Sequence, residues 1–277
     1  MPALTAPTLP VLALDTSTQT IAAGLHTGRQ AYTVQVPGGA LASVALIPQL
    51  QNLLGRAGLV WADLGAIAFG AGPGAFTGLR TSCAVAQGLG YGLQRPVLPL
   101  DSLLVVAEDA RAQAGAQAAG FEVGVAVDAR MDEVYAARYR WQAGQWQVLQ
   151  PPGLYGLATL AQAWAGVTQQ ALAGSALAAY GARLVLPAVG PRFEHEHDRA
   201  AALLRLAVAA VHSGAACDAA DALPLYLRDK VAYTSAEREA TAAAAAAAAA
   251  VAGRAVLPPV LPLAGDAQPG PAHPGHA

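Results

Sequence analysis

The chain has 277 residues, of which 55% are hydrophobic and 12% charged, and its formal net charge is −2. This composition excludes a disordered chain and provides enough apolar residues for one large domain or two lobes. The near-neutral charge, without a basic stripe, indicates that any nucleic acid is held mainly by a partner.

Neither the cysteines nor the first residues indicate secretion. Cys83 and Cys217 lie far apart and form no CxxC pair, so we expect a reducing compartment and no zinc site. Residues 1–10 lack the basic and apolar regions of a signal peptide. No apolar run reaches the length of a membrane span without glycine, proline or charge. We therefore expect a cytoplasmic protein with no membrane contact.

Residues 1–114 predict an N-terminal α/β lobe. Three strands come first, and the first of them ends at Asp15. Leu46, Leu50 and Leu53 recur at helical spacing, which predicts the first helix. The expected strands lie at 11–15, 21–27, 31–36, 66–69 and 96–100, and the expected helices at 41–56, 77–93 and 101–114.

Residues 115–232 predict a second α/β lobe. It also opens with a strand that ends in an acid, Asp128, followed by a polar turn and a return strand. Asp15 and Asp128 therefore occupy corresponding places, which indicates an internal duplication. The expected strands lie at 123–128, 134–139, 145–149, 170–173 and 184–186, the expected helices at 157–164, 176–183 and 199–212, and a last extended segment at 224–228.

Residues 233–277 have a different composition. A capping box at Thr234–Glu237 and nine alanines at 242–250 predict a tail helix. Proline and glycine dominate after Ala255, which is typical of disorder.

A glycine-rich turn, Gly70 to Gly78, joins a strand to a helix. Such a turn aims backbone N–H groups outward, as in sites that bind phosphate. However, the chain has no GxxxxGK[ST] motif, and the turn has neither the dinucleotide-binding pattern nor the serine of a hydrolase elbow. The turn therefore reads best as a structural one, in which Thr77 can cap the helix.

The helix that follows is rich in glycine and alanine and therefore carries few large side chains. Each interior glycine costs about 1 kcal/mol relative to alanine, so we expect another backbone to approach closely. That neighbour is either a core strand of the same chain or a helix of another subunit. One face of the helix is marked at a spacing of three to four residues by Leu79, Ser82 or Cys83, Ala86, Leu89 or Gly90, and Leu93.

Three further patterns have a functional and a structural interpretation. Asp15, Thr16 and Ser17 could lie near a nucleotide phosphate, with the acid orienting a metal-bound water, or could form a simple hairpin turn. His195 and His197 fit a solvated charged loop better than a metal site, and no HExxH motif occurs. The charged turn at 128–133 fits an ordinary hairpin surface. We expect no metal ligands and no catalytic residue.

Four motifs together resemble the TsaB (YeaZ) family, a subunit of the bacterial machinery that makes threonylcarbamoyladenosine (t6A) in tRNA. They occur in the family's order, and the glycine motif is specific. The motifs are Leu12-Ala13-Leu14-Asp15-Thr16-Ser17-Thr18, Gly72-Pro73-Gly74-Ala75-Phe76-Thr77-Gly78-Leu79-Arg80, Asp128-Ala129-Arg130-Met131-Asp132-Glu133-Val134-Tyr135 and Pro224-Leu225-Tyr226-Leu227-Arg228.

The resemblance implies an actin/Hsp70-like (ASKHA, ribonuclease H-like) α/β fold of two related lobes. It implies a non-catalytic subunit that pairs with the catalytic paralogue TsaD, works with the ATPase TsaE, and contacts tRNA only through the complex. ATP and Mg²⁺ would be used by the complex, with no cofactor bound by this chain. In the family, the helix after the glycine turn contributes to contacts between subunits. The resemblance therefore predicts a partner interface at Phe76, Gly78, Leu79, Ser82, Cys83, Ala86, Leu89, Gly90 and Leu93. Whether the isolated chain forms a homodimer stays open. Some members carry the label M22 glycoprotease, but this sequence offers no such chemistry.

One position departs from the family. The family commonly has a histidine ahead of a Leu-Leu-Pro in the first long helix, and Ala42 stands in its place here. Any polar role of that histidine is lost. The alternative function, an ATP-dependent small-molecule kinase or ATPase of the same fold, needs an open phosphate turn in each lobe, and the second lobe has Asp128-Ala129-Arg130 where a glycine-rich turn is wanted.

Overall fold

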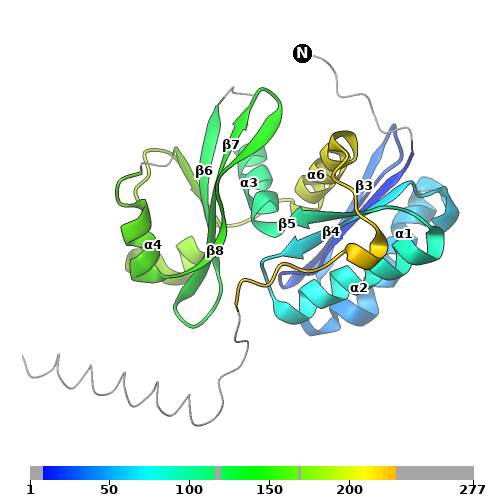
Figure 1. The fold of residues 1–277 in the computed structure, drawn as a ribbon, viewed down its shortest axis with the longest axis horizontal. Coiled ribbons are helices and arrows are strands. Elements are labelled where there is room, and N and C mark those ends of the chain that lie inside the picture. The colour runs from blue at the N-terminus through cyan, green and yellow to red at the C-terminus, as the bar shows by residue number, and fades with distance from the viewer. Residues whose placement is uncertain (1–8, 116–119, 168–169, 229–277) are drawn as a thin grey trace, which may run out of the picture. The chain divides into compact units, whose positions relative to one another are not determined.

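The computed structural model describes residues 9–115, 120–167 and 170–228, and two five-stranded sheets organise them (Figure 1). The expected tail helix and the end of the second lobe, residues 229–277, lie outside the described residues.

The first sheet has the order β3-β2-β1-β4-β5. The central strand β1 runs antiparallel to β2 and parallel to β4, and every residue of it is buried, because helices cover both faces of the sheet. The strands are β1 (Val11–Asp15), β2 (Thr20–His26), β3 (Ala31–Pro37), β4 (Ala66–Gly72) and β5 (Val97–Asp101).

The second sheet repeats this topology in the order β8-β7-β6-β9-β10, with a meander on one side of β6 and parallel strands on the other. The acids that end β1 and β6, Asp15 and Asp128, therefore occupy equivalent positions. The two sheets of matching topology confirm the predicted α/β fold of two related lobes, which the resemblance assigned to the actin/Hsp70-like class. The strands are β6 (Phe121–Asp128), β7 (Glu133–Gln142), β8 (Gln145–Gly156), β9 (Ala171–Ala173) and β10 (Arg192–Phe193).

Six α-helices and four short 3₁₀ helices occur in the described residues. The α-helices are α1 (Ala42–Ala57), α2 (Phe76–Leu93), α3 (Ser102–Gln113), α4 (Leu157–Trp164), α5 (Ala176–Tyr180) and α6 (Arg199–Ser213). The 3₁₀ helices are η1 (Gly39–Leu41), η2 (Trp61–Asp63), η3 (Gly181–Arg183) and η4 (Ala219–Asp221). The strand expected at 184–186 is absent from the described part of the chain, since Leu184 and Leu186 pack into the second-lobe core from an irregular segment.

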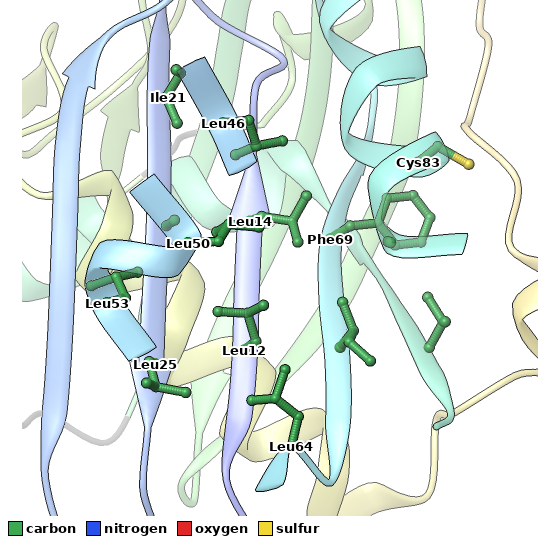
Figure 2. Close-up of a cluster of buried hydrophobic side chains, with 14 of the residues drawn as sticks. Leu12, Leu14, Ile21, Leu25, Leu46, Leu50, Leu53, Leu64, Phe69 and Cys83 are labelled. Carbon is green, nitrogen blue, oxygen red and sulfur yellow. The ribbon is translucent and has the colours of Figure 1, made fainter. Parts of the chain in front are cut away.

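Helices α1 and α2 cover one face of the first sheet (Figure 1). The leucines of α1 pack on alternate residues of β1 and β2, as Figure 2 shows for Leu46, Leu50, Leu12 and Leu14. Ala42 is buried in this same core. Gly58 ends α1 in the left-handed conformation, with φ +67°.

The helix α6 covers the opposite face of the first sheet, although it follows the second sheet in the sequence and was expected among the helices of the second lobe. Leu203 and Leu204 pack there against the small side chains of Ala13 and Ala68. These alanines, and Gly24 beneath Leu204, leave the room that the helix needs. The chain therefore returns to the first lobe after completing the second sheet.

The helix α3 serves both lobes. It follows β5 of the first sheet, and its Leu103, Val106 and Ala110 pack against Val123 and Tyr139 of the second sheet. Among the described residues, no helix is long and apolar enough to cross a membrane.

Candidate functional site

The glycine turn needs its glycines because the turn that follows β1, residues 15–17 (the acid turn), packs directly against it. A Cβ atom on Gly78 would come 1.8 Å from the carbonyl oxygen of Thr16, and one on Gly70 would come 2.2 Å from Oδ2 of Asp15. The Ala75 N–H donates to the Ser17 carbonyl at 2.8 Å. Only glycine permits these approaches, so the two motifs are one packed unit.

Thr16 and Ser82 are hydrogen-bonded inside this unit. The Thr16 N–H donates to Oγ of Ser82 at 2.8 Å, and the Thr16 hydroxyl donates to the Gly78 carbonyl at 2.7 Å. Both residues are buried. Ser82, predicted to lie at a partner interface, therefore faces the chain's own acid turn.

Asp15, predicted to lie near a nucleotide, is fully buried and paired with Arg199 of α6. Nη2 of Arg199 donates to Oδ2 of Asp15 at 2.8 Å and to Oγ of Ser17 at 3.1 Å, and Nη1 pairs with Glu196. Burial disfavours the charged guanidinium, but the carboxylates of Asp15 and Glu196 outweigh burial and raise the pKa of Arg199. The turn thus holds an internal cation.

The face of α2 that the sequence singled out packs against the rest of the chain. Gly90 lies against Val97 and Ala219, and the Cys83 thiol donates to the Ala222 carbonyl at 3.3 Å. Three of the nine predicted residues, Phe76, Leu89 and Leu93, are only partly buried. The buried ones are Gly78, Leu79, Ser82, Cys83, Ala86 and Gly90. The expected close neighbour was either part of the same chain or a helix of another subunit. For these six residues it is the same chain.

The opposite face of α2 is exposed and equally bare. Nothing lies within 4 Å of a Cβ atom placed on Gly88 or Gly92, and Tyr91 is 82% exposed. The neighbouring α1 exposes Val44, which is 70% accessible. The nine residues predicted for an interface do not include this face, although Arg80, Ala84, Gly88 and Tyr91 recur at helical spacing.

The segment 223–228, which carries the fourth motif, joins the two lobes. The Leu225 N–H donates to the Ala71 carbonyl at 2.7 Å, and the Tyr226 ring lies 5.1 Å from that of Phe76. Arg228 then reaches the second lobe, where it pairs with Glu133 at 2.5 Å. Two sequence motifs, the glycine turn and the turn at 129–133, are thus linked by a third.

The turn at 129–133 has an unusual backbone. Arg130, Met131 and Asp132 have φ angles of 64°, 59° and 57°, a left-handed run without glycine. Arg228 donates to the Ala129 carbonyl at 2.9 Å and to Sδ of Met131 at 3.3 Å. The turn is therefore more than the ordinary hairpin surface that its sequence suggested.

His195 and His197 lie on an exposed loop before α6. The carboxylate of Asp109 accepts the backbone N–H groups of His197 at 3.0 Å and Asp198 at 2.9 Å. Within the described residues, no group of three or more His, Cys, Asp or Glu side chains is placed to hold a metal ion. The loop serves to position the start of α6.

Comparisons with known proteins agree with this architecture. The sequence profile of the family described as TsaD, tRNA N6-adenosine threonylcarbamoyltransferase, matches residues 40–253. The tRNA threonylcarbamoyladenosine biosynthesis protein TsaB of Haemophilus influenzae is 35% identical over 127 residues, which cover 46% of this chain and 52% of that protein. The protein of the same description from Escherichia coli is 39% identical over 102 residues, covering 36% of this chain and 42% of that protein.

The curated relatives are thus matched over about half of their length or less. A solved structure described as YeaZ from Pseudomonas aeruginosa is similar over its whole length, with a TM-score of 0.70 and 34% identity, and the match covers 79% of this chain. A family profile that spans residues 40–253 and a fully matched YeaZ structure lead to one conclusion. The chain belongs to the family of TsaD-like proteins, in which it groups with TsaB (YeaZ).

Proposed function

We propose that this chain is a non-catalytic subunit that pairs with a TsaD-like protein and supports the transfer of a threonylcarbamoyl group to adenosine 37 of tRNA. The names of its relatives place them in t6A biosynthesis. The observation that carries the proposal is the exposed face of α2, where Gly88 and Gly92 have open space above them. Such a face lets a partner's helix come close.

The chemistry of the acid turn favours a subunit over an independent enzyme. A kinase or ATPase needs its acid and hydroxyls to face a nucleotide and its metal. Here the polar groups of Asp15, Thr16 and Ser82 are bonded to one another or to Arg199. The alternative function therefore has no support from this site, and we propose that ATP and Mg²⁺ act elsewhere in the complex.

The interface that we propose is the outer face of α2 with the exposed part of α1. Its residues differ from those predicted from the sequence, because six of those nine face inward. Small residues on the outer face allow close helix packing, and exposed apolar groups provide area to bury. The outer-face residues are Leu41, Val44, Arg80, Ala84, Gly88, Tyr91 and Gly92.

Further members of the complex follow from the family. We propose that a TsaE-like ATPase acts with the pair, that tRNA is contacted through the TsaD-like subunit, and that the assembly is cytoplasmic. A TsaD-like partner shares this chain's fold, so the same outer face can pair two copies of the chain when the partner is absent.

Co-purification tests the pairing. We expect the double variant Gly88→Leu, Gly92→Leu to lose the TsaD-like partner without a fall in its thermal unfolding midpoint, because both new side chains enter open space. A matched control, Ala163→Leu with Ala209→Leu, also introduces two leucines at exposed positions, on α4 and α6, and should retain the partner. Equal capture by both double variants would refute the proposed interface.

A further inference from the structure

Arg199 is a buried charge that comes from far along the chain. It lies in the first lobe, 184 residues after its partner Asp15, and only 3% of its side chain is exposed. Its Nε is buried without a hydrogen-bond partner among the described residues. A buried ion pair of this kind is weak grounds for stability, since an apolar pair often does as well. Its presence therefore calls for another explanation.

The guanidinium is bound by the same kinds of group that would serve a nucleotide and its metal in such a site. Asp15 ends the central strand β1, and an acid in that place can orient a metal-bound water while the hydroxyls that follow contact phosphate oxygens. Arg199 donates to both kinds of group, the Asp15 carboxylate at 2.8 Å and the Ser17 hydroxyl at 3.1 Å. One side chain thus satisfies the acid and a hydroxyl together.

The fold holds Arg199 in this place firmly. It is the first residue of α6, whose Leu203 and Leu204 are buried against the first sheet. Asp198 caps the helix by accepting the Ala201 N–H at 2.9 Å. Asp109 fixes the preceding backbone through the N–H groups of His197 and Asp198. The guanidinium is therefore built in, since both its helix and the loop before it are anchored.

The second lobe shows what the equivalent acid does without such a cation. Asp128 accepts the Tyr180 hydroxyl at 2.8 Å and the Arg130 N–H at 2.7 Å. Its ion pair, with Arg130 at 3.3 Å, involves a guanidinium that is 78% exposed. A neutral hydroxyl and a solvated arginine suffice there, so a buried cation is not a general need of this turn.

We propose that Arg199 is a resident cation that fills the turn after β1, so that the first lobe keeps the arrangement of an occupied nucleotide site without binding a nucleotide. The consequence is a lobe whose shape is independent of ATP. This inference deepens the proposed function, since it gives a scaffold a fixed first lobe. Its test measures ligand binding by the chain alone, so it can fail while partner capture succeeds.

The test is thermal unfolding of the full chain with and without millimolar methylguanidinium chloride. Arg199→Ala removes the charge and leaves a space that methylguanidinium can enter, and breaking the buried pair should lower the midpoint by roughly 6–20 °C. We expect methylguanidinium to raise the midpoint of this variant by binding at Asp15. The control, Arg199→Ala with Asp15→Asn, lacks the acid and should show no rise. An equal response of both variants would overturn the proposal.

A second measurement uses the wild-type chain and needs no variant to fold. Calorimetric titration with MgATP should give no saturable heat, because Arg199 occupies the turn. Arg199→Lys provides a further check, because an ammonium keeps the charge but lacks the fork that reaches Asp15, Ser17 and Glu196 together. We expect its midpoint to lie between those of wild type and Arg199→Ala. Saturable MgATP binding by wild type that Asp15→Asn abolishes would overturn the proposal.

Discussion

Two glycines of α2 show how one residue type serves opposite purposes on one helix. Gly78 lies against the Thr16 backbone, and Gly88 has nothing within 4 Å of the place a Cβ atom would take. The first is needed for packing inside the chain, and the second leaves a surface free. Both glycines lower the stability of the helix. Their different roles therefore follow from the groups around them and not from the residue type.

Replacing each glycine by alanine should therefore change stability in opposite directions. Gly78→Ala forces α2 away from the acid turn and should lower the free energy of unfolding by about 2–3 kcal/mol. Gly88→Ala should raise it by about 1 kcal/mol through helix propensity alone. Urea unfolding followed by circular dichroism measures both. Similar effects of the two substitutions would show that Gly78 is not packed as described.

Glu108 makes stability depend on pH. It is buried and accepts hydrogen bonds from Arg111 at 2.7 Å, Arg205 at 2.5 Å and Trp146 at 3.0 Å. Burial raises the pKa of Glu108, but the two arginines outweigh burial and hold it below its usual value of 4.5. The unfolded chain thus binds this proton at higher pH than the folded one.

It follows that the stability contributed by Glu108 is fully present above about pH 4.5 and is lost as the pH falls through the lower, folded-state pKa. Thermal midpoints measured between about pH 7 and about pH 3 should fall less steeply for Glu108→Gln than for wild type. Parallel pH profiles would contradict this assignment.

At the scale of elements, the left-handed turn at 129–133 is a strained segment that Arg228 contacts. A left-handed residue other than glycine costs roughly 1–2 kcal/mol, and three follow one another here. Such strain persists only where the surrounding structure imposes it. The hydrogen bonds of Arg228 to Ala129 and its ion pair with Glu133 provide that constraint.

Met131→Gly should relieve part of this strain. Because glycine adopts a positive φ freely but loses more entropy on folding, we expect a net gain of up to about 1 kcal/mol in the free energy of unfolding. Met131→Ala is the control, since it removes the same side-chain contacts and keeps the strain. Urea unfolding compares the two, and a glycine variant no more stable than the alanine variant would show that the turn is relaxed.

The helices and strands were largely predictable from the sequence. Which face of a helix packs inside the chain was not. Leucines at helical spacing define α1 and Gly58 marks its end, and the glycine turn marks the start of α2. The inner face of α2 was misassigned to a partner because a bare helix has two explanations, and the sequence does not say which backbone comes close. The pairing of Asp15 with Arg199 could not be predicted, because 184 residues separate them.

At the scale of the whole molecule, α3 joins the two lobes through a shared core. Leu103 and Val106 pack on the second sheet, and the Tyr139 hydroxyl donates to Asp101, which caps α3. The burial of Asp101 raises the pKa of its carboxyl against the effect of this hydrogen bond. The two lobes should accordingly unfold as one cooperative unit.

Tryptophan fluorescence can test this cooperativity. The chain has four tryptophans, and after Trp61→Phe the remaining three all belong to the second lobe. In that background, Leu14→Ala in the first-lobe core should lower stability by about 2–5 kcal/mol. We expect the second-lobe fluorescence transition in urea to shift with it. A fluorescence midpoint that stays unchanged while circular dichroism shifts would show that the lobes unfold independently.

The central claim is that the chain acts through a TsaD-like partner and catalyses nothing alone. The most direct measurement is threonylcarbamoyl transfer to tRNA by the purified TsaD-like protein and its ATPase, with and without this chain. We predict transfer only when the chain is present, and its loss with the Gly88→Leu, Gly92→Leu variant. Full transfer without the chain, or ATP turnover by the isolated chain that Asp15→Asn abolishes, would contradict the account.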